Sequence, residues 1–233
     1  MSDYQEQKEK VLQIAQRLSE HGYFGTKSGS AGNVSMLIEG TPYAAVTPSG
    51  KPYQDIVADE IAVVDMDGNR IEGDLEPSIE TPMHLACYKN RKDVNAVIHT
   101  HQIAATVFGI INHNIPALFD EVTVAIGKEI VVVPYGLSGS EDLLNNVVAN
   151  LDNRCHCYIL QNHGALAVGK NLDKAFTYIE LMEKVCTVYQ RALATGMEVT
   201  TLDETLAGAL HSIATSSQDM EIARKESLEQ AAN

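Results

Sequence analysis

The most informative stretch of this chain is Val94-Asn95-Ala96-Val97-Ile98-His99-Thr100-His101. Residues 94–98 have the length and the β-branched content of a short buried strand. Residues i and i+2 of a strand point to the same face, so His99 and His101 are expected to leave the sheet side by side. Two imidazoles placed in this way are typical of a divalent metal site, which needs at least one more ligand.

His163 is the best candidate for that third ligand. It lies in Gln161-Asn162-His163-Gly164, after the apolar stretch Cys157-Tyr158-Ile159-Leu160 and before a glycine at which the chain must turn. The alternative is that these are ordinary core or surface histidines, which is the commoner case for an isolated His-x-His pair. Of the other histidines, His84 is interpreted as packing beside the site or supporting it, and the rest as structural: His21, His113, His156 and His211.

The composition excludes several classes of protein. The chain has 233 residues, 45% of them hydrophobic, which indicates a folded protein with a sizeable core. Its net charge of −14 argues against nucleic acid or an anionic membrane as a partner, because both require basic surfaces. No apolar stretch reaches the roughly 20 residues that span a bilayer, and the polar N-terminal segment is unlike a signal peptide.

The cysteines predict a reduced, cytoplasmic protein. All four are spread along the chain without a C-x-x-C pair. The segment Cys155-His156-Cys157 could suggest a second metal site. It begins an apolar run, however, where cysteine is usually a small buried hydrophobe. We therefore interpret it as the start of a buried strand.

The hydrophobic pattern predicts one α/β domain over residues 1–233, with helices around a central sheet. Helices are expected at residues 5–21, 80–90, 104–111, 141–151, 172–195 and 202–226. Strands are expected at residues 34–39, 43–47, 61–65, 70–72, 94–98, 130–134, 157–160 and 165–168. The turn Met66-Asp67-Gly68-Asn69 joins two of these strands as a hairpin, and no repeat or linker divides the chain.

Three loops combine small or turn-forming residues with hydroxyl or amide side chains: Gly32-Asn33, Ser49-Gly50 and Pro77-Ser78. Backbone amides in such loops can form a nest for an anion, and Ser78 precedes a helix whose N-terminus would favour a phosphate. Each loop taken singly is better explained as a simple turn or cap. Glu80 is a candidate catalytic carboxylate, and the alternative is that it only compensates the helix dipole.

Taken together and in this order, these segments resemble the class II aldolase/adducin family. The resemblance covers almost the whole chain and is carried by Ser30-Ala31-Gly32-Asn33-Val34-Ser35, Thr47-Pro48-Ser49-Gly50, Pro77-Ser78-Ile79-Glu80, Ala96-Val97-Ile98-His99-Thr100-His101 and Asn162-His163-Gly164. It implies a central, mainly antiparallel sheet with helices on both sides. It also implies a homotetramer with fourfold symmetry and active sites between neighbouring subunits.

The same resemblance assigns roles to individual residues. A divalent metal, most often zinc and otherwise manganese, cobalt or iron, is expected on His99, His101 and His163. Phosphate binding is expected at Gly32, Asn33, Ser49, Gly50 and Ser78. Glu80 favours carbon–carbon cleavage, because fuculose-phosphate-type aldolases have Glu at this position, ribulose-phosphate 4-epimerases have Asp, and methylthioribulose-phosphate dehydratases lack the carboxylate.

The chain departs from the aldolase pattern near Glu80 and further along. Ile79 replaces a serine and removes one expected phosphate contact. Asp120 stands where the aldolases have a tyrosine that serves the neighbouring subunit, and Glu121 is close to the position of a catalytic glutamate in the dehydratases. No tyrosine follows Tyr189, so the C-terminal tyrosine of some relatives is missing. The acidic pair has no obvious basic partner nearby, and we expect it at a subunit boundary, where one member handles the proton on the aldehyde side.

The activity implied is that of a metal-dependent aldolase. It would cleave a small phosphorylated sugar, a ketose 1-phosphate of the fuculose, deoxyribulose or methylthioribulose type, into dihydroxyacetone phosphate and an aldehyde through a metal-bound enediolate. Glu80 would be the proton donor and acceptor. Two alternatives remain: epimerisation, dehydration or decarboxylation on the same scaffold, and a non-catalytic adducin-like binding module.

Overall fold

The computed structural model describes residues 3–26 and 29–232, and in this part the chain forms a nine-stranded sheet. Lys27 and Ser28, in the small polar segment before the first expected strand, lie outside the described residues. The strands are β1 (Asn33–Ile38), β2 (Tyr43–Val46), β3 (Ala62–Asp65), β4 (Arg70–Glu72), β5 (Ala96–Thr100), β6 (Ile115–Pro116), β7 (Glu129–Val133), β8 (Cys157–Leu160) and β9 (Gly164–Gly169). Their order across the sheet is β4-β3-β2-β1-β5-β9-β8-β7-β6. All neighbouring pairs are antiparallel except β7 and β8, so the prediction of a mainly antiparallel sheet is confirmed.

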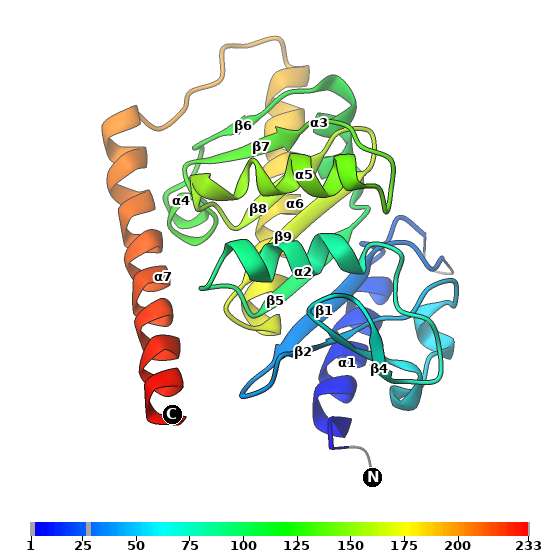
Figure 1. Cartoon of the computed structure of the whole chain (residues 1–233). Coiled ribbons are helices and arrows are strands. Elements are labelled where there is room, and N and C mark those ends of the chain that lie inside the picture. Colours follow the sequence, from blue (N-terminus) through cyan, green and yellow to red (C-terminus); the bar gives the residue numbers. More distant parts are fainter. Residues whose placement is uncertain (1–2, 27–28, 233) are drawn as a thin grey trace.

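Helices cover both faces of this sheet, as predicted. They are α1 (Gln5–Glu20), α2 (Thr81–Asn90), α3 (Ile103–Ile111), α4 (Asp120–Ala125), α5 (Glu141–Val148), α6 (Leu172–Ala194) and α7 (Glu204–Ala232). One apolar core contains side chains of α1, α3 and α6, and a second core contains side chains of α2 and α5. In Figure 1, α2 and α5 lie in front of the sheet, α6 lies behind it, and α7 runs along one side of the molecule.

The central strands are apolar because they are buried on both sides. In β5, Ile98 belongs to the core under α1 and α6, whereas Val97 belongs to the core under α2 and α5. The same alternation runs through β9, where Ala167 and Val168 face opposite cores. Each buried valine or isoleucine contributes about 1.5–3 kcal/mol of hydrophobic stabilisation. The strand that carries His99 and its neighbour β9 are therefore buried along their whole length.

The structure corrects several expected element boundaries. The central strand begins at Ala96 and ends at Thr100, so His99 lies inside it; the expected strand covered residues 94–98. The strand extends to Thr100 because it pairs with β1 and β9. The hydrophobic pattern along the sequence does not reveal such pairing. The last helix extends to Ala232, whereas the expected helix ended at residue 226. The helix Asp120–Ala125 was not predicted, because six residues are too few to show a helical period.

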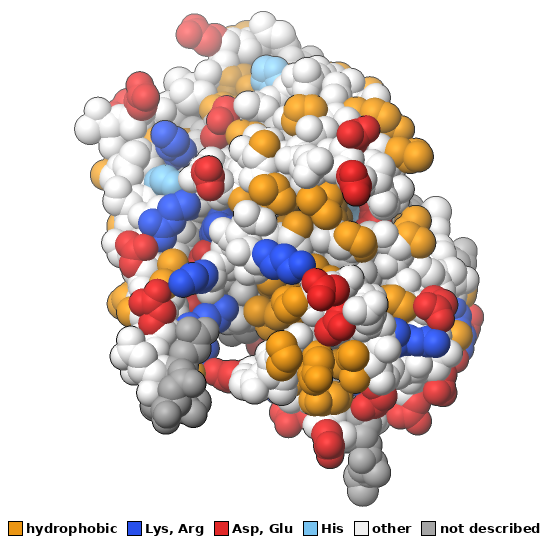
Figure 2. Space-filling model, viewed as in Figure 1, with side chains coloured by type: hydrophobic (Ala, Val, Ile, Leu, Met, Phe, Trp, Pro, Cys, Tyr) orange, Lys and Arg blue, Asp and Glu red, His pale blue; other side chains and the backbone are white. Residues whose placement is uncertain are grey.

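Polar contacts attach the long helix α7 to the rest of the molecule. Arg154 pairs with Asp219 at 2.7 Å, and Arg224 pairs with Glu39 at 2.8 Å. In Figure 2, many of the basic side chains lie on the side of the molecule that carries α7, whereas acidic side chains are spread over the whole of this face, the α7 side included. Within residues 3–26 and 29–232, no helix is both long enough and apolar enough to cross a bilayer.

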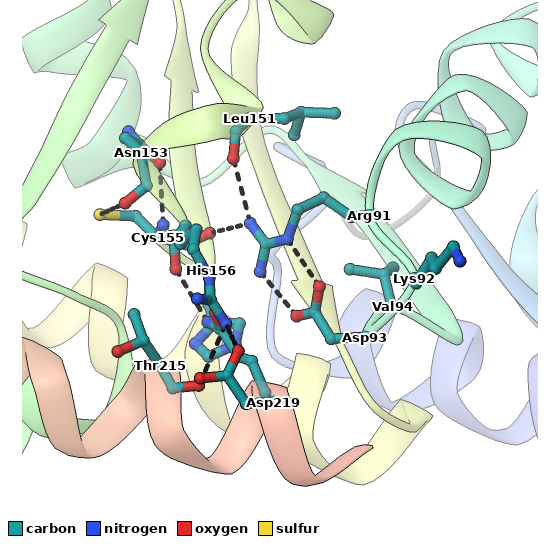
Figure 3. A network of polar contacts seen from close by, with 12 residues as sticks. Arg91, Lys92, Asp93, Val94, Leu151, Asn153, Cys155, His156, Thr215 and Asp219 are labelled. Atoms are coloured by element: carbon teal, nitrogen blue, oxygen red, sulfur yellow. Dashed lines mark hydrogen bonds and ion pairs between the residues drawn. The ribbon is translucent and has the colours of Figure 1, made fainter. Parts of the chain in front are cut away.

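A buried network of polar contacts around Arg91 joins the end of α2 to the segments that precede β5 and β8 (Figure 3). Arg91 donates to both carboxylate oxygens of Asp93, at 2.8 and 2.7 Å, and to the carbonyl oxygens of Leu151 and Cys155, at 3.4 and 3.1 Å. A buried guanidinium is tolerated only when its N–H groups are satisfied, and these acceptors satisfy it. The network holds the segments that lead into β5 and β8 together.

Candidate active site

Strand pairing brings three histidines together. His99 lies in β5, His101 follows the end of that strand, and His163 lies in the turn between β8 and β9. Because β9 pairs with both β5 and β8, the turn before it is placed at the end of β5. The Nε2 atoms of His99 and His101 are 3.0 Å apart, and one ligand atom from each of the three rings lies within 4.8 Å of the others.

Gly164 permits this close approach. A Cβ atom at position 164 would lie 2.3 Å from the carbonyl oxygen of Thr100 and 3.1 Å from ring atoms of His99 and His101. Side chains of any size are thus excluded where β9 starts against β5. The glycine after His163 is therefore required by packing, and the Asn162-His163-Gly164 turn can approach the other two histidines only with glycine at its end.

The protonation of the rings suits a cation. Nδ1 of His99 donates to the carbonyl oxygen of Ala165 at 2.9 Å, which leaves Nε2 directed toward the other two rings. Burial lowers the pKa of His101 to about 3 and the pKa of His163 to about 4. Both rings are consequently neutral near pH 7, which is the form that binds metals.

A buried carboxylate lies beside the three rings. Glu80 is the residue before α2 and is only 5% exposed. Its Oε2 is 3.2 Å from Nε2 of His99, and its Oε1 is 3.4 Å from Nε2 of His163. A residue that only compensated a helix dipole would be free to point into solvent, but this carboxylate points at ring nitrogens.

Four groups stabilise the negative charge of Glu80. Burial by itself would raise the pKa of Glu80, but His99, the amide of Asn33, His163 and the hydroxyl of Ser138 together lower it to about 2. Asn33 Nδ2 donates to Oε2 at 2.8 Å, and Ser138 Oγ donates to Oε1 at 2.8 Å. Glu80 is therefore an ionised carboxylate that lies among ring nitrogens and accepts two hydrogen bonds.

This donor set fits a divalent metal ion. Three imidazoles and one carboxylate oxygen are ligands that zinc and its neighbours in the first transition row accept. The Nε2 atoms of His99 and His101 face each other at 3.0 Å, an arrangement that a cation between them would stabilise. Among the described residues, this trio of histidines is the group whose ligand atoms converge in this way.

The other histidines and the cysteines lie elsewhere in the fold. His84 is fully buried, and its Nδ1 is 2.7 Å from Ser35 Oγ, so it packs behind the site. His156 Nδ1 donates to the carbonyl oxygen of Ala125 at 2.8 Å. Cys155 and Cys157 are buried in the cores on opposite faces of the sheet and cannot converge on one ion. The segment Cys155-His156-Cys157 is structural in this fold, in agreement with its interpretation from the sequence.

The three polar loops also meet beside Glu80. Asn33 Nδ2 donates to Ser78 Oγ at 3.0 Å, and Ser49 Oγ accepts from the backbone N–H of Ile79 at 3.2 Å. A β-bridge between Pro48 and Pro77 holds the second and third loops together. Gly32 precedes Asn33, and Gly50 follows Ser49 with a positive φ of 75°. Four of the five residues expected to bind phosphate therefore lie in loops near the carboxylate, and the fifth, Asn33, begins β1 and contacts the carboxylate directly.

Comparison with known proteins identifies the family. The model of the "Class II Aldolase and Adducin N-terminal domain" matches residues 9–190. The chain belongs to the class II aldolase and adducin family.

Its relatives include several aldolases. It is 35% identical over 204 residues to the L-fuculose phosphate aldolase of Escherichia coli K12, covering 87% of this chain and 93% of that protein. It is 33% identical over 196 residues to the 5-methylthioribulose-1-phosphate/5-deoxyribulose-1-phosphate aldolase of Escherichia coli O45:K1, covering 84% and 89%. A solved structure of an L-fuculose 1-phosphate aldolase superposes with a TM-score of 0.82 at 30% identity, covering 91% of this chain and 96% of that one.

The acidic pair expected to complete the proton relay lies apart from this cluster. Asp120 and Glu121 begin α4, and both are exposed. The expectation that the pair lacks a basic partner is wrong for Glu121, whose carboxylate pairs with Lys184 of α6. The two residues are 63 positions apart, so the sequence gives no sign of their contact. Within the described residues, no hydrogen bond or ion pair joins either acid to the histidines or to Glu80.

The sequence interpretation missed Ser138. Two residues further on, Ser140 caps α5 by accepting from the backbone N–H of Leu143 at 3.3 Å. Ser138 instead donates to Glu80, 58 positions away. A hydroxyl between two glycines after a buried strand was the available signal, but it does not reveal which residue the hydroxyl contacts.

The contact at Gly164 leads to a prediction. In Gly164→Ala, the new methyl group must displace β9 from Thr100, and overpacking of this kind costs about 1–3 kcal/mol. Because the displaced segment carries His163, the affinity for zinc should fall together with the melting temperature. Thermal unfolding and zinc titration of the purified variant measure both quantities.

Gly208→Ala is the matched control. Gly208 lies inside α7, and a Cβ atom there would have no neighbour within 4 Å. Alanine in a helix interior is favoured over glycine by about 0.8–1 kcal/mol, so this variant should be at least as stable as the wild type and should bind zinc normally. Normal stability and normal zinc affinity in Gly164→Ala would contradict the packing requirement.

Proposed function

We propose that this protein is a metal-dependent aldolase. It cleaves a ketose 1-phosphate of the fuculose, deoxyribulose or methylthioribulose type into dihydroxyacetone phosphate and an aldehyde. The observation that carries the proposal is the buried carboxylate of Glu80, which lies 3.2 and 3.4 Å from two of three converging imidazoles. The names of the relatives, which are aldolases for fuculose, deoxyribulose and methylthioribulose phosphates, support the substrate class.

His99, His101 and His163 hold the metal ion in this proposal. Zinc is the first choice because it accepts three imidazoles readily, and manganese, cobalt and iron are alternatives. A divalent ion supplies Lewis acidity that stabilises negative charge on substrate oxygens. The hydrogen bond from His99 to the carbonyl oxygen of Ala165 orients the ring for this task.

Glu80 moves the proton. Its low pKa keeps the carboxylate ionised near pH 7, the state that removes a proton from carbon in the condensation direction. In the cleavage direction the same carboxylate returns a proton to that carbon. Its position before α2, next to Ser78, also places it at the border of the phosphate loops.

The phosphate is bound by the three loops in this proposal. The donors without a formal charge are the backbone N–H groups of Gly32 and Gly50, the side-chain amide of Asn33 and the hydroxyls of Ser49 and Ser78. The backbone N–H groups of Ser49 and Ser78 instead donate to the carbonyl oxygens of Glu76 and Thr47. The amide of Asn33 is shared between Glu80 and Ser78, so this residue connects the phosphate loops to the proton-transferring carboxylate. Ile79 adds no donor from its side chain, which is aliphatic and 64% exposed, and its backbone N–H donates to Ser49 Oγ.

We further propose a homotetramer in which Asp120 or Glu121 reaches the active site of a neighbouring subunit. Both acids are exposed, and α3 carries three isoleucines that are more than half exposed: Ile103, Ile110 and Ile111. Aliphatic side chains on a helix surface suit a contact between subunits.

Light scattering of the purified protein should give four times the chain mass of 25.3 kDa, and a monomer with full activity would refute the shared site.

Removal of one histidine should remove the metal. His101→Ala takes away one of three nitrogen ligands, so metal content and turnover are expected to fall together. The measurement is metal analysis of the purified protein after incubation with zinc and dialysis. His156→Ala is the control, because this ring contacts Ala125 and lies in a different part of the fold; its metal content should equal that of the wild type.

The same measurement separates an enzyme from a binding module. An adducin-like module has no need for a metal, so a wild-type protein that takes up none would support that alternative. Full metal content and full turnover in His101→Ala would show that the three histidines do not form the site.

At saturating zinc, Glu80→Gln should retain the metal on the three histidines and lose about 10²- to 10⁴-fold in turnover, because the amide has almost the same size but cannot carry a proton. Turnover is measured as release of dihydroxyacetone phosphate from fuculose 1-phosphate, 5-deoxyribulose 1-phosphate and 5-methylthioribulose 1-phosphate. Formation of another product by the wild type would instead identify an epimerase, a dehydratase or a decarboxylase.

Glu76→Gln is the control for this variant. Glu76 lies four residues earlier, is 77% exposed and pairs with Arg70 at 3.0 Å, so its loss should not change turnover. If Glu80 only compensated a helix dipole, Glu80→Gln would cost about 0.3–1 kcal/mol of stability and leave turnover near normal.

A further inference from the structure

The two oxygens of Glu80 have separate hydrogen-bond donors. Asn33 Nδ2 donates to Oε2 and Ser138 Oγ donates to Oε1, both at 2.8 Å. Asn33 begins β1, is only 3% exposed and pairs with His99 across the sheet, so the first donor is part of the rigid core. Ser138 lies in the connection between β7 and α5, and its own position must be fixed by that loop.

Three close contacts fix the position of this loop. The backbone N–H of Tyr135 donates to Oε1 of Gln161 at 3.0 Å, and Gln161 belongs to the turn that carries His163. A Cβ atom on Gly136 would lie 2.4 Å from the backbone nitrogen of Leu143, so the loop is pressed against the start of α5. Gly139 has a positive φ of 74°, and a Cβ atom there would lie 3.2 Å from the carbonyl oxygen of Ile79. The hydroxyl of Ser138 is therefore presented to Glu80 from a defined direction.

We propose that Ser138 is a positioning residue that orients the carboxylate of Glu80 toward the three histidines. With both oxygens held, rotation about the last side-chain bond of Glu80 is prevented. Without Ser138, Oε1 has only Nε2 of His163 nearby, at 3.4 Å, and the carboxylate can turn away from the rings. Ser138 acts only through Glu80. The inference rests on the proposed function, because it concerns how the proton-transferring carboxylate of that site is held.

The loop contains its own control residue. Ser140 is two positions from Ser138, and its hydroxyl accepts from the backbone N–H of Leu143 to cap α5. Loss of such a cap destabilises the helix but removes no contact with Glu80. Ser140→Ala therefore reports what a merely structural hydroxyl in this loop contributes.

The experiment compares Ser138→Ala, Ser138→Thr and Ser140→Ala with the wild type. Loss of a group that orients a ligand of a metal site typically lowers metal affinity or activity about 10–100-fold. For Ser138→Ala we expect a loss in this range in zinc affinity, measured by competition with a chelator, together with a changed absorption spectrum of the cobalt-substituted protein. On a ketose 1-phosphate that the wild type cleaves, kcat should fall while KM changes little.

Ser138→Thr should restore wild-type values, because threonine keeps the hydroxyl and the exposed position has room for a methyl group. Ser140→Ala should lower the melting temperature and leave zinc affinity, spectrum and kcat unchanged. The proposal is wrong if Ser138→Ala matches the wild type in zinc affinity and cobalt spectrum, or if Ser140→Ala loses as much as Ser138→Ala.

These outcomes separate the inference from the proposed function. A wild-type protein that binds zinc but cleaves none of the ketose phosphates would reject the proposed reaction, and the zinc and cobalt measurements would still decide the role of Ser138. A wild-type protein that binds no divalent metal would reject both.

Discussion

The active-site cluster depends on one packing constraint, the insertion of β9 between β5 and β8. This pairing places the turn that carries His163 at the end of the strand that carries His99. The contact is so close that a side chain at position 164 would overlap the carbonyl oxygen of Thr100. The burial of all three strands by helices on both faces stabilises this arrangement, since the pairing cannot slip without exposing apolar side chains. The geometry of the site is thus a consequence of how the core is packed.

A second constraint is the burial of a charge. An unpaired carboxylate that is 95% buried would be strongly unfavourable, and Glu80 is tolerated because imidazoles, an amide and a hydroxyl surround it. The same surroundings lower its pKa and keep it ionised. The residues around Glu80 therefore stabilise the fold and also keep the carboxylate ionised. A change in any of these residues should affect both the stability of the protein and the ionisation of Glu80.

The scaffold is shared by proteins with different reactions, so the surroundings of Glu80 are what can distinguish this chain from its relatives. Ile79 places an exposed aliphatic side chain between Ser78 and Glu80, next to the loop that carries Ser138. None of the residues proposed to bind phosphate has a positively charged side chain. Specificity in such a site depends on local hydrogen-bond donors and shape, and the overall charge of −14 is spread over the outer surface.

The sequence alone determined those features that depend on neighbours along the chain. The pair His99 and His101, the glycine after His163, the hairpin turn at residues 66–69 and most helices follow from local periodicity and turn chemistry. The resemblance of ordered motifs identified the family. Tertiary structure decided what depends on distant contacts: Ser138 reaches Glu80 over 58 positions, Lys184 reaches Glu121 over 63, and the helix Asp120–Ala125 forms against α6 and α7. A hydrogen bond or an ion pair between distant segments leaves no periodic signal in the sequence, because it is the fold that brings its partners together.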